Sequence, residues 1–137
     1  MTTDTKSAAS FYSKVVGWKT QPWKENPSYT MFTVKGRPMA GLMALPEPGA
    51  PLTWVTYIGV PNLEETLRQA ESLGGKVLKT PEDIPTIGRF ALVQDPQGAM
   101  FAAFTPLPSS ASSSMPDAPP AVGDFSWHEL PTTDWRS

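Results

Sequence analysis

The chain has 137 residues, 39% of them apolar, and a formal net charge of -2, which suits one compact domain or two small modules that share a core. The charge balance, with no run of Lys or Arg, excludes the basic surface that binds nucleic acid, and no apolar run reaches the roughly 20 residues that span a bilayer. The absence of Cys excludes disulfides, and the single His, His128, excludes sites that need several imidazoles from one chain. Because no signal peptide is visible, we expect a cytoplasmic protein.

Residues 1–46 are expected to form a module of one helix followed by three strands. Thr3 or Asp4 can cap the helix, and Gly17 ends it. One face of this helix is predicted to be apolar, with Ala8, Phe11, Tyr12 and Val15. Turn-rich segments separate the three strands, which are expected at residues 18–23, 29–34 and 39–45.

Residues 52–105 are expected to form a second module that has a strand in front of its helix. The leading strand, 52–60, is aromatic and β-branched, and Asn62 caps the helix that follows. The predicted buried stripe of this helix comprises Leu63, Leu67, Ala70 and Leu73, and Gly74-Gly75 end it. Three more strands are expected at residues 76–79, 89–94 and 99–105, the last two joined by a turn at 95–98.

The two modules correspond to each other at a constant offset. Asp4 and Gly17 bracket the first helix as Asn62 and Gly75 bracket the second, which indicates duplication. The alternative is that caps and Gly stops recur in any two helices of equal length. If the duplication holds, the first module lacks its leading strand.

The C-terminal segment offers a candidate for that strand. Residues 106–123 are rich in Pro and Ser and are expected to be a linker. Residues 124–137 begin with a predicted strand, which runs into Thr132-Thr133-Asp134, a repeat of Thr2-Thr3-Asp4. The strand is therefore expected to complete the first module within the chain, as a circular permutation, or to complete a partner chain in a homodimer.

Three segments of the sequence resemble the vicinal oxygen chelate superfamily, which includes glyoxalase I, bleomycin-resistance proteins and extradiol dioxygenases. These segments are residues 9–18, the helix end Leu73-Gly74-Gly75 and the turn Asp95-Pro96-Gln97-Gly98. The resemblance implies an α+β fold of paired βαβββ modules around a cleft that holds a small ligand, often with a divalent metal. Residues 125–134 also resemble the start of a further module, so the chain looks like a piece of a tandem-domain member.

The positions where metal-dependent branches of the family commonly have ligands can be checked in this sequence. The resemblance places a His seven residues before the helix cap, which corresponds to Trp127 and Val55, and a Glu four residues after the Asp-Pro-x-Gly turn, which corresponds to Ala102. None of these side chains can ligate a metal, so we expect no metal of the family type and no cofactor. His128 is one residue out of register and should point away from the cleft.

Glu129 is a weak candidate for a general base. If it shares a strand face with Trp127, an apolar cleft would raise its pKa; the alternative is that it lies at a hydrated rim. The cleft-lining positions expected to bind a ligand are Val55, Tyr57, Met100, Ala102, Phe104 and Trp127. This lining suits a small apolar or aromatic molecule, although the same residues could be ordinary core.

The sequence therefore predicts a small-molecule binding protein without a metal. One alternative is a metal-dependent lyase or dioxygenase of the same superfamily. Another is a fragment of a larger tandem protein, with a structural role by itself.

Overall fold

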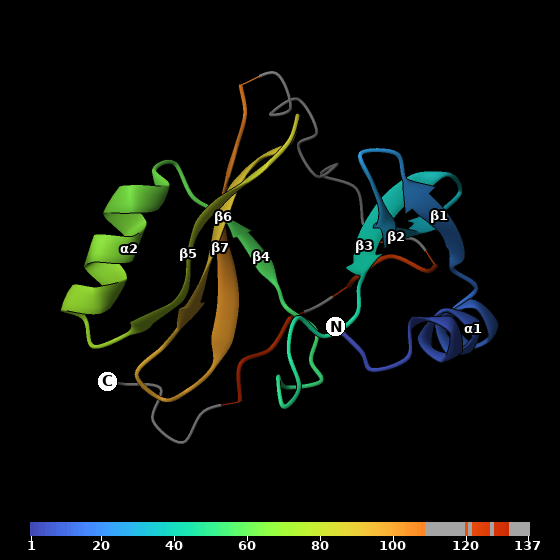
Figure 1. Ribbon diagram of the computed structural model, residues 1–137, viewed down its shortest axis with the longest axis horizontal. Coiled ribbons are helices and arrows are strands. Elements are labelled where there is room, and N and C mark those ends of the chain that lie inside the picture. The colour runs from blue at the N-terminus through green and yellow to red at the C-terminus, as the bar shows by residue number, and fades with distance from the viewer. Residues whose placement is uncertain (109–119, 121, 127, 132–137) are drawn as a thin grey trace. The chain divides into compact units, whose positions relative to one another are not determined.

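The computed structural model describes residues 1–108, 120, 122–126 and 128–131 (Figure 1). The chain divides into unit 1, Met1–Trp54 with Asp117–His128, and unit 2, Val55–Pro116 with Glu129–Ser137. Unit 1 has the element order α-β-β-β, and unit 2 has the order β-α-β-β-β. The expected α+β class and glyoxalase-like order of elements are confirmed. No helix among the described residues is both long and apolar enough to cross a membrane.

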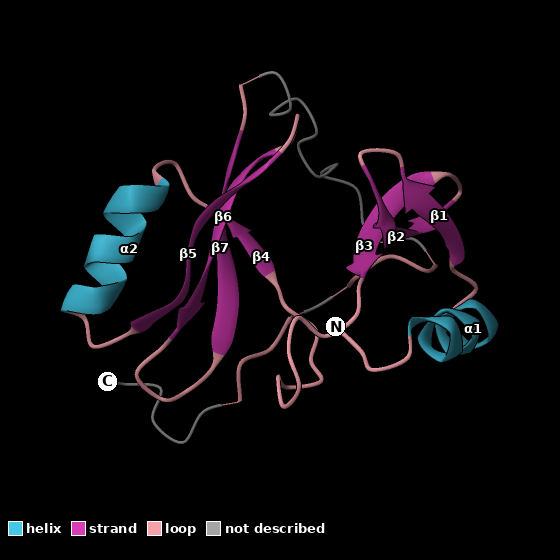
Figure 2. Ribbon diagram, viewed as in Figure 1, coloured by secondary structure: helices cyan, strands magenta, loops and turns pink. Residues whose placement is uncertain are grey.

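Unit 1 is a three-stranded antiparallel sheet with one helix against it (Figure 2). Its elements are α1 (Thr5–Val15), β1 (Lys19–Trp23), β2 (Asn26–Val34) and β3 (Arg37–Leu42), in the sheet order β1-β2-β3. The predicted cap is present, because the Asp4 carboxylate accepts a 2.9 Å hydrogen bond from the backbone N–H of Ser7. Gly17 follows the helix with φ +75°, a conformation that favours glycine.

The core of unit 1 consists of Trp18, Phe32 and Leu42, with small side chains of α1 packed on it. Two members of the expected apolar face are not part of it, since Phe11 is 57% and Val15 63% exposed. Successive helical residues are about 100° apart, and α1 is turned so that Ala9 rather than Phe11 faces the sheet. The predicted face was therefore wrong for Phe11 and Val15.

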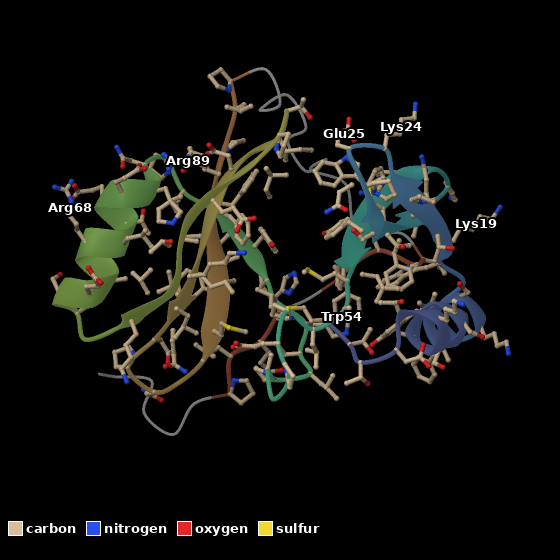
Figure 3. The ribbon with its side chains drawn as sticks, viewed as in Figure 1. Lys19, Lys24, Glu25, Trp54, Arg68 and Arg89 are labelled. Atoms are coloured by element: carbon tan, nitrogen blue, oxygen red, sulfur yellow. The ribbon has the colours of Figure 1, made fainter. Side chains whose placement is uncertain are left out.

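Unit 2 is a four-stranded sheet with a helix on one face. Its elements are β4 (Tyr57–Gly59), α2 (Leu63–Ser72), β5 (Lys76–Ile84), β6 (Gly88–Gln94) and β7 (Met100–Pro106). The sheet order is β4-β7-β6-β5, with β4 parallel to β7 and the other pairs antiparallel. The Asn62 side chain accepts from Glu65 N–H at 2.9 Å, which confirms the second cap. On the same side of the sheet, Arg89 (labelled in Figure 3) pairs with Glu64 of α2 at 2.6 Å.

The helix of unit 2 buries a narrower stripe than expected. Leu63 and Leu67 lie in the core with Ala91, Val93 and Ala103, and Ala70 packs against this core. Leu73 is the C-cap residue and is 70% exposed, so its predicted burial was wrong. The helix ends there, and Gly74 follows with φ +85°, which turns the chain away before Leu73 can reach the sheet.

The strand expected at residues 52–60 is shorter in the structure and spans only Tyr57–Gly59. The residues before it serve unit 1 instead. The Trp54 indole N–H donates to the Tyr12 hydroxyl at 3.0 Å, and its ring packs edge-on against Tyr12 and Trp18. Thr53 accepts a hydrogen bond from the N-terminal ammonium group at 3.1 Å.

The C-terminal segment contacts unit 1 through residues 123–125, and its described residues, 122–126 and 128–131, form no strand. The Trp18 indole N–H donates to Gly123 O at 2.7 Å, Asp124 pairs with Arg37 at 2.6 Å, and the Phe125 ring packs against Trp18. Thus the strand predicted at residues 124–130 is absent from the described residues. Its pairing with unit 1 or with a partner chain stays a prediction.

Candidate functional site

The sheet of unit 2 has one face that α2 does not cover. Cross-strand partners share a face, and Tyr57 pairs with Ala102, which pairs with Leu92. Phe90 pairs with Phe104 one step along, and alternation adds Met100. We name this surface the open face of unit 2; it comprises Tyr57, Phe90, Leu92, Met100, Ala102 and Phe104.

Three aromatic rings dominate this open face. The Tyr57 ring centroid lies 5.6 Å from that of Phe90 and 6.3 Å from that of Phe104, in tilted and edge-on geometry. Tyr57 is nevertheless 50% exposed. At the edge of the cluster, Lys79 Nζ lies 5.2 Å from the Phe90 ring centroid and also pairs with Glu82 at 2.5 Å.

A glycine fixes the position of the Phe104 ring. A Cβ atom built on Gly88 would lie 2.8 Å from two carbons of this ring and 2.4 Å from Thr105 O. Two carbons of the ring therefore occupy space that a side chain at position 88 would fill. The shape of the aromatic surface depends on this glycine.

Four of the predicted ligand-binding residues, Tyr57, Met100, Ala102 and Phe104, come together on the open face. Ala102 is fully buried, so it can only form the floor of this surface. Val55 is half-buried and precedes β4, and Trp127 lies outside the described residues. The sequence analysis did not predict Phe90, Leu92 and Lys79 as part of this surface. A hairpin closed by the turn at 95–98 would have placed Phe90 and Leu92 opposite residues of the final strand.

Glu129 and His128 are both exposed. The His128 ring stacks on Phe125 at 5.8 Å between centroids. Glu129 lies in irregular backbone, and its suggested role as a general base stays untested by this geometry.

The donors that the family's metal would need are missing at the positions checked above. Val55 and Ala102 carry alkyl side chains, and the described residues contain no cluster of three or more His, Cys, Asp or Glu side chains that could hold an ion. The described residues therefore do not fit a metal of the family type.

The sheet of unit 1 also has a face turned away from its helix, and a tyrosine shapes it. A Cβ atom on Gly41 would lie 1.6 Å from the Tyr29 hydroxyl oxygen, so the phenol lies directly on the β3 backbone. The Tyr29 ring meets Trp23 edge-on at 5.8 Å, and burial raises the pKa of Tyr29 above 10.0. No sequence signal for this contact was noted, because it depends on how β2 and β3 pair.

Comparisons with known proteins agree with this fold. A protein named "Putative glyoxylase CFP32" from Mycobacterium tuberculosis is 36% identical over 103 residues, which are 74% of this chain and 40% of that protein. "Anthracycline biosynthesis protein DauV" from Streptomyces sp. (strain C5) is 28% identical over 148 residues, covering 96% of this chain and 52% of that protein. The chain thus spans about half the length of these curated relatives, or less.

A solved structure supports the fold alone. The crystal structure described as NAD-dependent benzaldehyde dehydrogenase from Legionella pneumophila matches with a TM-score of 0.50 at 19% identity, covering 77% of this chain and 93% of that one. The family model described as Glyoxalase/Bleomycin resistance protein/Dioxygenase superfamily matches residues 1–103. Because this match covers more than half of the chain, the protein belongs to the Glyoxalase/Bleomycin resistance protein/Dioxygenase superfamily.

Proposed function

We propose that the protein binds a flat apolar or aromatic small molecule on the open face of unit 2, without a metal of the family type. The observation that carries this proposal is the cluster of Tyr57, Phe90 and Phe104, with Tyr57 half-exposed on a sheet face that α2 leaves uncovered. Large aromatic side chains on a sheet face are normally covered by a second layer, so this surface is suited to an apolar occupant.

The chemistry of the face defines the ligand class. Stacking against these rings contributes about 0.5–1.5 kcal/mol per aromatic pair beyond simple burial, which favours a planar ring system. The Tyr57 hydroxyl can both donate and accept a hydrogen bond. Lys79 at the edge of the cluster can donate to a carbonyl or phenolate oxygen of the ligand, in competition with Glu82.

The name of one relative supports the same class. DauV is named for anthracycline biosynthesis, and anthracyclines contain fused planar rings with carbonyl and hydroxyl groups. The 28% identity extends over 96% of this chain, so both units are included in the match. We infer that a polycyclic aromatic compound is the ligand class to test first.

The alternative is a metal-dependent lyase or dioxygenase, a reading favoured by the name of CFP32. Metal analysis of the purified protein discriminates between the two functions. Stoichiometric Fe, Mn, Ni or Zn that is lost on Glu129→Gln would support the alternative and contradict our proposal.

Isothermal titration calorimetry with a soluble anthracycline aglycone tests the proposal directly. We expect Tyr57→Ala to weaken binding by about tenfold, since a lost ring contact of roughly 1.4 kcal/mol corresponds to that factor. Leu73→Ala is the matched control, because it removes an exposed apolar side chain from the far end of α2 and should leave the affinity unchanged. Equal affinity in Tyr57→Ala and wild type would refute this location for the ligand.

A further inference from the structure

The edge strand of the unit 2 sheet adds charged side chains on the side that α2 leaves uncovered. Cross-strand partners share a face, and in β5 Lys79 pairs with Leu92 while Glu82 pairs with Phe90. Leu92 and Phe90 both belong to the open face of unit 2. Lys79 and Glu82 therefore project on the same side of the sheet as the aromatic rings, so this side is largely apolar on β4, β7 and β6 and charged along β5.

An irregularity in β5 brings these two charged residues to the same side. They are three positions apart, so in a regular strand their side chains would project on opposite faces. The register of β5 shifts between Lys79 and Glu82, and the two side chains pair at 2.5 Å. Such shifts, typical of β-bulges, re-aim side chains and are common next to functional sites. Here the shift places an ion pair beside the aromatic rings.

Lys79 is the charged group that a ligand stacked on these rings would meet. Its Nζ lies 5.2 Å from the centroid of the Phe90 ring. The centroid of the Tyr57 ring lies 5.6 Å from the same point, although β7 separates the strands that carry Tyr57 and Phe90. The Phe90 ring thus lies next to both an ammonium group and a phenol. A planar molecule that covers Phe90 would contact both of them.

The balance of charge on this side of β5 favours an anionic ligand. Lys76 pairs with Gln94 on the same side as Lys79, so two lysines and one acidic residue, Glu82, project there. The other acidic residue of β5, Asp83, projects toward the helix side, where it takes part in an ion pair. Positive charge therefore prevails along this edge, although the chain as a whole has a net charge of -2.

The ion pair with Glu82 leaves Lys79 able to exchange its partner. The two side chains are 45% and 54% exposed, and water screens a pair of this kind so that it contributes little to stability. A ligand that covers Phe90 would remove water from around the ammonium group, which strengthens the attraction of Lys79 for a negative charge at the same place. An anionic oxygen of the ligand can then replace the carboxylate of Glu82, which turns back into water.

We propose that the ligand of the open face of unit 2 is an aromatic acid, with its rings on Tyr57 and Phe90 and a carboxylate or phenolate that accepts a hydrogen bond from Lys79 Nζ. This inference rests on the function proposed above and specifies the charge of the ligand. Lys79 is then the residue that selects an anionic aromatic compound over a neutral or cationic one. Glu82 opposes binding, because it competes for the same ammonium group.

Titration calorimetry of the full chain with 2-naphthoate and 2-naphthamide tests this selection, because the two probes share a ring system and differ in charge. We expect wild type to bind the carboxylate about fivefold more tightly, the difference between a hydrogen bond to a charged and to a neutral group. Lys79→Met should remove this preference, Lys79→Arg should retain it, and Glu82→Gln should increase it. Arg68→Met is the matched control, since it removes the same charge from α2, on the other side of the sheet, and should leave the preference unchanged.

The ratio of the two affinities separates the charge of the ligand from its location. Equal binding of both probes by wild type, or a preference that persists in Lys79→Met, would overturn the choice of an acid. If Tyr57→Ala still weakens both probes in that case, the proposed location of the ligand stands. Binding of neither probe would count against the location and the charge together. Tighter binding of 2-naphthylmethylammonium than of 2-naphthoate would assign recognition to Glu82 instead and would also overturn the proposal.

Discussion

Truncation of Leu63 should show how strongly α2 depends on its buried stripe. Leu63 is 2% exposed in the core of unit 2, next to Leu67 and Ala103. Leu63→Ala deletes three carbon atoms, at about 0.8 kcal/mol for each buried methylene-sized group, and leaves a cavity that adds to this loss. We therefore expect a decrease of about 3 kcal/mol in the free energy of unfolding, within the range of roughly 2–5 kcal/mol that buried Leu→Ala changes show.

The matched control is Leu73→Ala at the end of the same helix. The chemical change is identical, but Leu73 is 70% exposed, so its effect should stay within about 0.5 kcal/mol. Urea unfolding followed by far-UV circular dichroism measures both variants. Circular dichroism is preferred to tryptophan fluorescence, because Trp18, Trp23 and Trp54 lie in unit 1 rather than beside α2. Equal losses in the two variants would show that the stripe reaches Leu73, as the sequence pattern suggested, and would refute the placement of this residue in the structure.

Two further predictions concern pH. The Ser7 N–H and hydroxyl hold the pKa of the Asp4 carboxyl below 3.8, so the stabilisation is present above that pH and is lost as pH falls through the folded-state pKa. Asn at position 4 still caps the helix but does not titrate, so Asp4→Asn should lose less melting temperature than wild type between about pH 6 and about pH 2. An unchanged acid profile would contradict this reasoning. Burial raises the Tyr29 pKa above 10.0, so stability is complete below that pH and declines as pH rises through the folded-state value. Tyr29→Phe should flatten this alkaline decline in the melting temperature, and an equally steep decline would count against desolvation of the phenol.

Signals contained within a few neighbouring residues predicted the structure well. Asp4 and Asn62 both cap helices through N–H groups three residues on, as their residue types indicate. The turn at 95–98 is closed by a hydrogen bond from Gly98 N–H to Asp95 O. Each of these features depends on chemistry inside a single turn of chain, so distant packing does not change it.

Features that depend on distant partners were not predictable in the same way. Leu73 matches the apolar period of α2, but the helix ends at this residue, and periodicity does not show which side of a stripe meets the sheet. Trp54 has the composition of a strand residue and instead contacts Tyr12, more than forty positions earlier. β5 continues to Ile84 through two register shifts, past the expected end at residue 79.

The candidate sites follow the same division between local and distant information. Tyr57 could be predicted because the duplicated sequence pattern gives its position relative to the nearby helix cap. Phe90 belongs to the open face of unit 2 only through its cross-strand pairing with Phe104, which the sequence pattern did not show. Glu129 occupies the position in the C-terminal repeat that Tyr57 occupies in unit 2, yet it is exposed and lies in irregular backbone, because the strand predicted at residues 124–130 is absent from the described residues. The sequence can therefore locate this position, but whether its side chain joins a sheet face depends on strand pairing, which the local pattern does not contain.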